Sequence, residues 1–179
     1  MILGAILAGG QASRFGSDKA LAELDGRSLI ALAVEALGAQ CDHVIVVGRV
    51  VAPVPTVPDW PRPGMGPLGG LAGALRHALA EGYHQVLTCG VDAAALPGDL
   101  AEWLSPGPAC LEEQPVIGLW PAAAAPVLEA FLQRDERHAV KRFADLVGAR
   151  RVRIDTPIPN INTPLDLAAE QARRRHPRP

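Results

Sequence analysis

The chain has 179 residues, enough for one domain with a sizeable core, and its content of 49% hydrophobic but only 4% aromatic residues predicts an aliphatic core. The formal net charge of −2 excludes a global attraction for nucleic acid or for an anionic membrane. Any anion-binding site must therefore be local.

The three cysteines, Cys41, Cys89 and Cys110, are odd in number and lack the spacing of a zinc site or a disulfide framework. The longest uncharged stretch, 114–128, contains three prolines, which disfavours a membrane span. No basic segment precedes the first apolar run, as it does in a secretory leader. We expect a cytoplasmic monomer with no nucleic-acid or membrane partner.

Short apolar runs alternate with amphipathic segments along the chain, a pattern typical of a parallel sheet covered by helices on both faces. Strands are predicted at 2–7, 43–47, 85–89 and 151–154, with an extended segment at 110–119. Helices are predicted at 29–38, 71–82, 97–104, from 126, at 139–146 and from 164. This order predicts an α/β, Rossmann-like three-layer fold with a mostly parallel central sheet. One domain is expected over residues 1–172, followed by a frayed basic tail over 173–179.

The segment after the first predicted strand combines Gly9 and Gly10 with two cations, Arg14 and Lys19. Glycines accept positive φ, so the N–H groups of residues 8–11 can turn around an anion. A guanidinium can fork onto two phosphate oxygens, and a flexible ammonium can follow charge as it moves. The glycines alone fit a tight turn, but the added cations favour a phosphate-binding loop. Its spacing matches neither a Walker loop nor a dinucleotide fingerprint, which disfavours a dehydrogenase.

Asp92 lies just after the predicted strand 85–89, at the edge where open α/β sheets bind ligands. A single carboxylate, completed by phosphate oxygens and waters, is a usual way for a protein to hold Mg²⁺. The local sequence also fits an ordinary turn residue. Asp92 is therefore the candidate metal ligand.

A second glycine-rich segment, 59–70, begins with Asp59. Its glycines allow close approach to a flat base, and the carboxylate can accept hydrogen bonds from ribose hydroxyls or a base amino group. The alternative is a Pro/Gly surface loop that leads into a helix. Near the C-terminus, Asn160 and Asn162 are two residues apart on an extended segment, so their amides point the same way, toward an acceptor phosphate or the metal.

These motifs together resemble the MobA-like nucleotidyltransferases, the molybdenum cofactor guanylyltransferases. Residues 7–10, Arg14, Gly16 and 18–20 resemble the signature loop of that family. The segment 59–70 is similar to the family's Asp…Gly-Pro-Leu-Ala-Gly segment. Residues 160–167 are similar to its Asn-x-Asn-Thr-Pro-x-Asp/Glu-Leu motif, and the whole resemblance covers residues 2–168.

The resemblance implies transfer of GMP from GTP, or of a nucleotide from another NTP, to the phosphate of a molybdopterin-type acceptor, with release of pyrophosphate and Mg²⁺ as cofactor. It implies that Arg14, Lys19 and Asp92 are catalytic and that Asp92 holds the metal. The nucleotide-binding residues that it implies are Leu7, Ala8, Gly9, Gly10, Arg14, Lys19, Asp59, Gly66, Pro67, Leu68, Asp92, Asn160 and Asn162.

Three departures from the family pattern concern the substrates more than the reaction. The segment 90–94 keeps the acid but lacks the proline of the family's Pro-Cys-Asp-x-Pro. Val47 stands where a MobA-type enzyme can carry asparagine, and Gln114-Pro115 replaces His-Pro. A related enzyme that uses CTP or a sugar-phosphate acceptor therefore stays open, as does a nucleotide-binding protein without catalysis.

Overall fold

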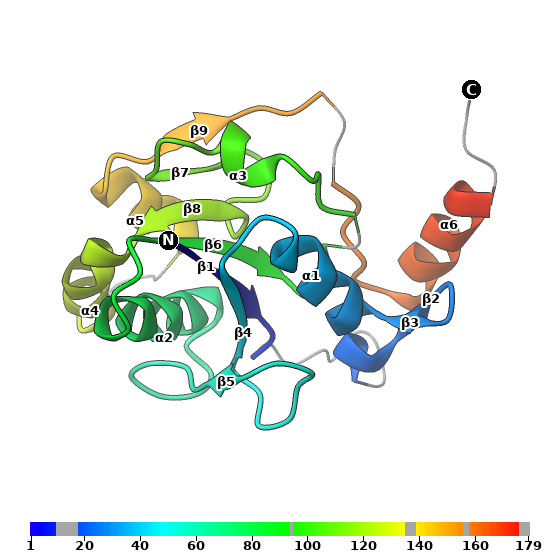
Figure 1. Ribbon diagram of the computed structural model, residues 1–179, viewed down its shortest axis with the longest axis horizontal. Helices are drawn as coiled ribbons and strands as arrows, with labels where there is room; N and C mark the ends of the chain where they lie inside the picture. Colours follow the sequence, from blue (N-terminus) through cyan, green and yellow to red (C-terminus); the bar gives the residue numbers. More distant parts are fainter. Residues whose placement is uncertain (10–17, 94, 135–138, 156–157, 176–179) are drawn as a thin grey trace.

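The computed structural model describes residues 1–9, 18–93, 95–134, 139–155 and 158–175. Within these residues the centre of the molecule is a seven-stranded sheet in the order β5-β4-β1-β6-β8-β7-β9 (Figure 1). Its strands are β1 (Ile2–Leu7), β4 (His43–Val47), β5 (Thr56–Val57), β6 (Gln85–Gly90), β7 (Ala109–Leu111), β8 (Gly118–Pro121) and β9 (Arg150–Val152). Only the two described pairings of β8, with β6 and β7, are antiparallel. The prediction of a mostly parallel sheet is confirmed.

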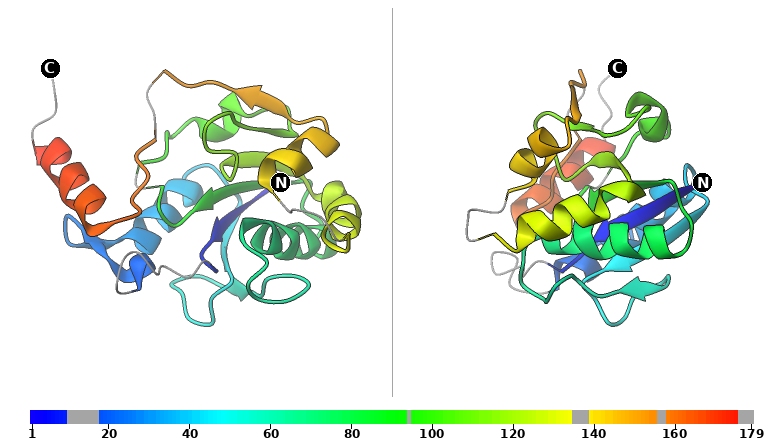
Figure 2. Two further views of the ribbon diagram at one scale, coloured as in Figure 1. Left: turned by 180° about the vertical axis from the view of Figure 1, so that it is seen from behind. Right: turned by 90° about the vertical axis from the view of Figure 1, so that its left-hand side faces the viewer.

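Helices cover both faces of this sheet (Figure 2). On one face lie α2 (Pro67–Ala80), α4 (Ala125–Leu132) and α5 (Val140–Leu146), and on the other lie α1 (Leu29–Gly38) and α3 (Leu100–Trp103). Successive strand residues point to opposite faces, so Leu3 and Ala5 of β1 pack with α2 while Ile6 packs with α1. This arrangement is the expected three-layer fold. None of the described helices is long and apolar enough to cross a bilayer.

Two helix starts follow from capping signals in the sequence. Ser28 Oγ accepts a hydrogen bond of 3.4 Å from the N–H of Ala31 at the start of α1. At the start of α6 (Pro164–Arg175), Thr163 and Asp166 each accept a bond from the other's backbone N–H, at 3.2 and 2.8 Å. Helix α6 continues through residues 173–175 of the segment expected to fray, and residues 176–179 lie outside the described ones.

Three elements differ from their predicted bounds. Helix α2 begins at Pro67, so Gly69 and Gly70 belong to its first turn and not to a loop. Proline is favoured at this position because the first helical N–H has no partner inside the helix. The predicted extended segment 110–119 contains a reversal, with β7 and β8 antiparallel to each other. Helix α3 begins at Leu100, after the predicted start at Pro97.

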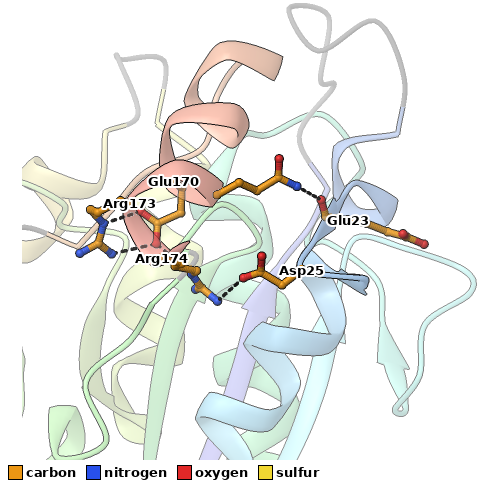
Figure 3. A network of polar contacts seen from close by, with 6 residues as sticks. Glu23, Asp25, Glu170, Arg173 and Arg174 are labelled. Carbon is orange, nitrogen blue, oxygen red and sulfur yellow. Dashed lines mark hydrogen bonds and ion pairs between the residues drawn. The ribbon is translucent and has the colours of Figure 1, made fainter. Parts of the chain in front are cut away.

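A small hairpin of β2 (Glu23–Leu24) and β3 (Arg27–Ser28) holds α6 against the rest of the domain (Figure 3). The side chain of Glu170 is only 4% exposed, and its carboxylate accepts hydrogen bonds from Arg173 at 2.8 Å and from Arg174 at 3.0 Å. Arg174 also lies 3.7 Å from the carboxylate of Asp25 in the hairpin turn. These contacts fix the helix that directly follows the two asparagines.

We expect Glu170→Gln to lower the free energy of unfolding at neutral pH by about 1–2 kcal/mol, because it removes charge-assisted hydrogen bonds. The Arg173 guanidinium holds the pKa of Glu170 below its ordinary value. This stabilisation is therefore full above the ordinary pKa of a glutamate and is lost as pH falls through the lowered one. Urea unfolding of both proteins at neutral and acidic pH measures it.

The matched control is Glu112→Gln, which removes an ion pair with Arg153 whose side chains are both exposed. It should leave the urea midpoint unchanged, because exposed ion pairs contribute little. Equal midpoints for Glu170→Gln and wild type at neutral pH contradict the role assigned to Glu170.

Candidate active site

A cavity of about 430 Å³ opens beyond the carboxyl ends of β1, β4 and β6. Most of the predicted binding residues line it, namely Leu7, Ala8, Gly9, Lys19, Asp59, Gly66, Pro67, Asp92 and Asn160. The Leu68 side chain is instead buried in the core beneath α2 and does not line the cavity. Gly10 and Arg14 lie outside the described residues.

Lys19 is the meeting point of three distant segments. Its ammonium Nζ lies 3.1 Å from Asp92 Oδ2 and 3.1 Å from Asn162 Oδ1. These partners are 73 and 143 residues away along the sequence, so the fold alone brings them together. With 14% of its side chain exposed, Lys19 holds its charge at a partly desolvated place, where electrostatic interactions are stronger than in water.

Backbone hydrogen bonds fix the carboxylate and the asparagines relative to one another. The N–H of Ala93 donates to the carbonyl of Gly90 and closes the turn that carries Asp92. The N–H of Ile161 then donates to the Asp92 carbonyl at 3.1 Å, and Asn160 forms a β-bridge with Ala93. This pairing holds the turn that carries Asp92 against the segment of the two asparagines.

The oxygen atoms around the ammonium suit a hard divalent cation. Asp92 Oδ2 and Asn162 Oδ1 already enclose one positive charge, that of Lys19. Among the described residues no group of three or more His, Cys, Asp or Glu side chains is placed to hold a metal ion. Phosphate oxygens and waters would therefore complete the coordination, as they usually do for Mg²⁺.

Asp59 presents a buried acceptor without a donor. Its residue is 9% exposed, and within the described part of the chain Oδ1 has no hydrogen-bond partner. Burial raises the pKa of this carboxyl above its ordinary value. Such a group is costly unless a donor meets it, so it points to a ligand that brings N–H or O–H groups.

Glycines make the room for this carboxylate. A Cβ on Gly9 would lie 2.8 Å from Asp59 Oδ2, and one on Gly48 would lie 2.8 Å from Oδ1. Gly48 also has a φ of +83°, a backbone conformation that residues other than glycine rarely adopt. Gly70 packs in the same way, since its Cβ would lie 3.2 Å from Leu7 Cδ2. Gly70 therefore serves the site from inside α2.

Two residues with no predicted role also line the cavity, Asp18 and Arg49. Arg49 follows the end of β4 by two residues and forks onto Asp18 at 2.8 and 2.6 Å. One signal was present in the sequence, a charged residue just beyond the carboxyl end of a buried strand. The pairing itself depends on the fold.

Residues 4–153 match the family described as MobA-like NTP transferase domain. Molybdenum cofactor guanylyltransferase from Rhodobacter capsulatus is 36% identical over 99% of both chains. The protein of the same name from Acidiphilium cryptum is 35% identical over 94% of this chain and 93% of its own.

Solved structures share the fold. Molybdopterin-guanine dinucleotide biosynthesis protein A from Archaeoglobus fulgidus matches with a TM-score of 0.76 at 20% identity, over 96% of this chain and 97% of that one. A Mycobacterium tuberculosis protein in complex with manganese matches with a TM-score of 0.63 at 14% identity, over 96% and 98%. Because the family match extends from β1 into β9 and the curated relatives span nearly the full length, this chain belongs to the MobA-like nucleotidyltransferases.

Proposed function

We propose that this enzyme transfers GMP from GTP to the terminal phosphate of a molybdopterin-type acceptor and releases pyrophosphate, with Mg²⁺ held at Asp92. The observation that carries the proposal is one cavity lined by Lys19, Asp92 and the buried Asp59, whose Oδ1 has no described partner, with Asn162 hydrogen-bonded to the same Lys19 ammonium. The names of the curated relatives support the choice of base and acceptor.

The reaction needs no protein nucleophile, because the acceptor phosphate is already ionised. The task of the site is to align that oxygen with the α-phosphorus of GTP and to stabilise the charge that develops on the transferred and leaving groups. Lys19 would follow the α-phosphate, and the backbone N–H groups near Gly9 would bind the leaving phosphates. Arg14 is proposed to clamp those phosphates as well, by resemblance to the family.

Asp92, with Asn162 beside it, would hold the metal. When bound, Mg²⁺ supplies a Lewis acid that neutralises phosphate charge and orients the triphosphate. The Lys19 ammonium donates to Asp92 Oδ2 and to Asn162 Oδ1. Phosphates of a nucleotide whose metal is held by these two oxygens would therefore lie next to the ammonium. Asn160, on the cavity wall, is proposed to meet the acceptor phosphate.

Asp59 supplies the reason to favour guanine. Guanine presents an N1–H and an exocyclic amine side by side, and these two donors match the two oxygens of one carboxylate. Adenine and cytosine lack this paired arrangement, because a ring acceptor stands beside their amine, and would leave one of the two carboxylate oxygens without a donor. An unmet buried partner costs about 1–3 kcal/mol, which is a discrimination of roughly fivefold to 150-fold.

A thermal-shift panel tests this assignment. We expect GTP with Mg²⁺ to raise the melting temperature more than ATP, CTP or UTP at equal concentration, because only ligands that bind the native state stabilise it. Asp59→Asn keeps the shape of the side chain and should remove most of the preference for GTP.

The same variant without ligand has an expected stability of its own. A carboxyl whose pKa is raised by folding destabilises the folded state once pH exceeds its ordinary pKa. Ligand-free Asp59→Asn should therefore be at least as stable as wild type at neutral pH, with the advantage vanishing in acid.

In the thermal-shift panel, a larger shift for CTP than for GTP, or an unchanged GTP preference in Asp59→Asn, contradicts the guanylyl assignment.

A further inference from the structure

Arg49 is held in place by three hydrogen bonds from its guanidinium to the protein. Its Nη1 and Nη2 donate to Asp18 Oδ1 and Oδ2 at 2.8 and 2.6 Å, and Nε donates to the carbonyl of Val51 at 3.4 Å. Three of the five N–H donors of the side chain are thus used. A fork onto a carboxylate is also the geometry in which arginine is held most firmly.

Asp18 carries out a second task with the same carboxylate. Oδ1 accepts a 3.1 Å bond from the N–H of Ala20 and caps η1 (Lys19–Leu21), the turn that carries Lys19. Arg49 therefore ties the segment after β4 to the turn that presents the central ammonium. The bond from Ala20 to Asp18 holds the turn only locally. Among the described contacts of the Asp18 side chain, only those from Arg49 connect the turn to the segment after β4.

The charge of Asp18 conflicts with the ligand expected in the cavity. Arg49 holds the pKa of Asp18 below its ordinary value, so the carboxylate is ionised at neutral pH. Asp18 lines the cavity that would receive a triphosphate, and an uncompensated carboxylate there would repel it. The guanidinium cancels that charge at hydrogen-bond distance.

We propose that Arg49 is a positioning residue of the nucleotide site, which neutralises Asp18 and anchors the turn of Lys19 without contacting the nucleotide itself. The inference rests on the proposed function, because it needs a polyphosphate in the cavity. It extends that function by assigning a role to Arg49, which none of the sequence motifs includes, through its ion pair with Asp18.

A double-mutant cycle tests the proposal. Pyrophosphate release with GTP is measured for wild type, Arg49→Ala, Asp18→Asn and the double variant, and asparagine keeps the capping oxygen. We expect Arg49→Ala to raise the KM for GTP about tenfold. The double variant should return KM to within about threefold of wild type, because both charges are gone. Arg27→Ala removes an exposed ion pair with Glu35 outside the cavity, and it should leave KM and kcat unchanged.

The conservative variant separates charge from geometry. Arg49→Lys keeps the positive charge but loses the fork, so KM should stay near wild type while kcat falls several-fold. This variant also keeps the test informative if Arg49→Ala does not fold, as judged by circular dichroism.

The opposite pattern overturns the proposal. A nucleotide contact by Arg49 predicts that the double variant is as impaired in KM as Arg49→Ala, and a bystander role predicts no change in any variant. Wild type that neither binds GTP nor releases pyrophosphate would instead refute the proposed function, and the inference would fall with it.

Discussion

Asp92→Asn should lower Mg²⁺-dependent pyrophosphate release by about a thousandfold or more, the largest effect that we expect of any single substitution. The change keeps the shape of the side chain and removes the charge that would hold the cation. It also removes the ion pair with Lys19, whose ammonium lies 3.1 Å from Asp92 Oδ2. The backbone bonds of the turn do not involve the carboxylate, so the fold should survive.

Steady-state assays with GTP, acceptor and Mg²⁺ measure this loss, with the melting temperature as the test of folding. Asp99→Asn is the matched control, since Asp99 is exposed, does not line the cavity and makes no side-chain cap bond to α3. It should retain wild-type rates. Retained Mg²⁺-dependent activity in Asp92→Asn would remove Asp92 from the role of metal ligand.

Lys19→Ala is expected to lower kcat by roughly a hundredfold or more, with a smaller loss of GTP affinity. A cation aimed at charge that develops in the transition state typically contributes a few kcal/mol to the barrier. On the proposed function the neutral N–H groups near Gly9 would still bind phosphate, so we expect the ground-state complex to suffer less than the transition state.

The chain offers a simple control for this substitution, because it has two lysines and the second, Lys141, is exposed on α5. Lys141→Ala should leave kcat and KM at wild-type values. Near-normal turnover in a folded Lys19→Ala protein would contradict the assignment of Lys19 to the α-phosphate.

The sequence predicted the elements whose signals are local. Strand β1 and helix α1 were found because an uninterrupted apolar run and a serine cap are legible within ten residues. The start of α6 was found for the same reason, from the reciprocal bonds of Thr163 and Asp166. The Asp25-Gly26 turn between β2 and β3 is an equally local hairpin signal. No hairpin was predicted there, because the neighbouring strand and helix were assigned without it.

Other features depend on contacts between distant segments. Gly69 and Gly70 favour a loop by propensity, yet they lie in α2, where close packing on Met65, Leu7 and Asp59 leaves no room for larger side chains. The antiparallel course of β8 depends on its pairing with β6. Local sequence does not encode such a pairing.

The candidate site shows the same division. Lys19, Asp59, Asp92 and the asparagines were predicted from motifs, and the fold brings Lys19, Asp92 and Asn162 within hydrogen-bond distance. The glycine at position 48 and the pairing of Arg49 with Asp18 were not predicted. Their roles appear only when the segment after β4 lies beside the segment after β1, which is a property of the parallel sheet.

The central claim is most directly tested by following the α-phosphate of GTP. Protein, Mg²⁺, molybdopterin and GTP labelled at the α-phosphate are incubated, and the labelled products and pyrophosphate are quantified together. We predict that the label moves to a molybdopterin guanine dinucleotide, with one pyrophosphate released for each label transferred, and that Asp92→Asn abolishes both. Faster transfer from CTP than from GTP, or pyrophosphate release without any labelled dinucleotide, would contradict the account.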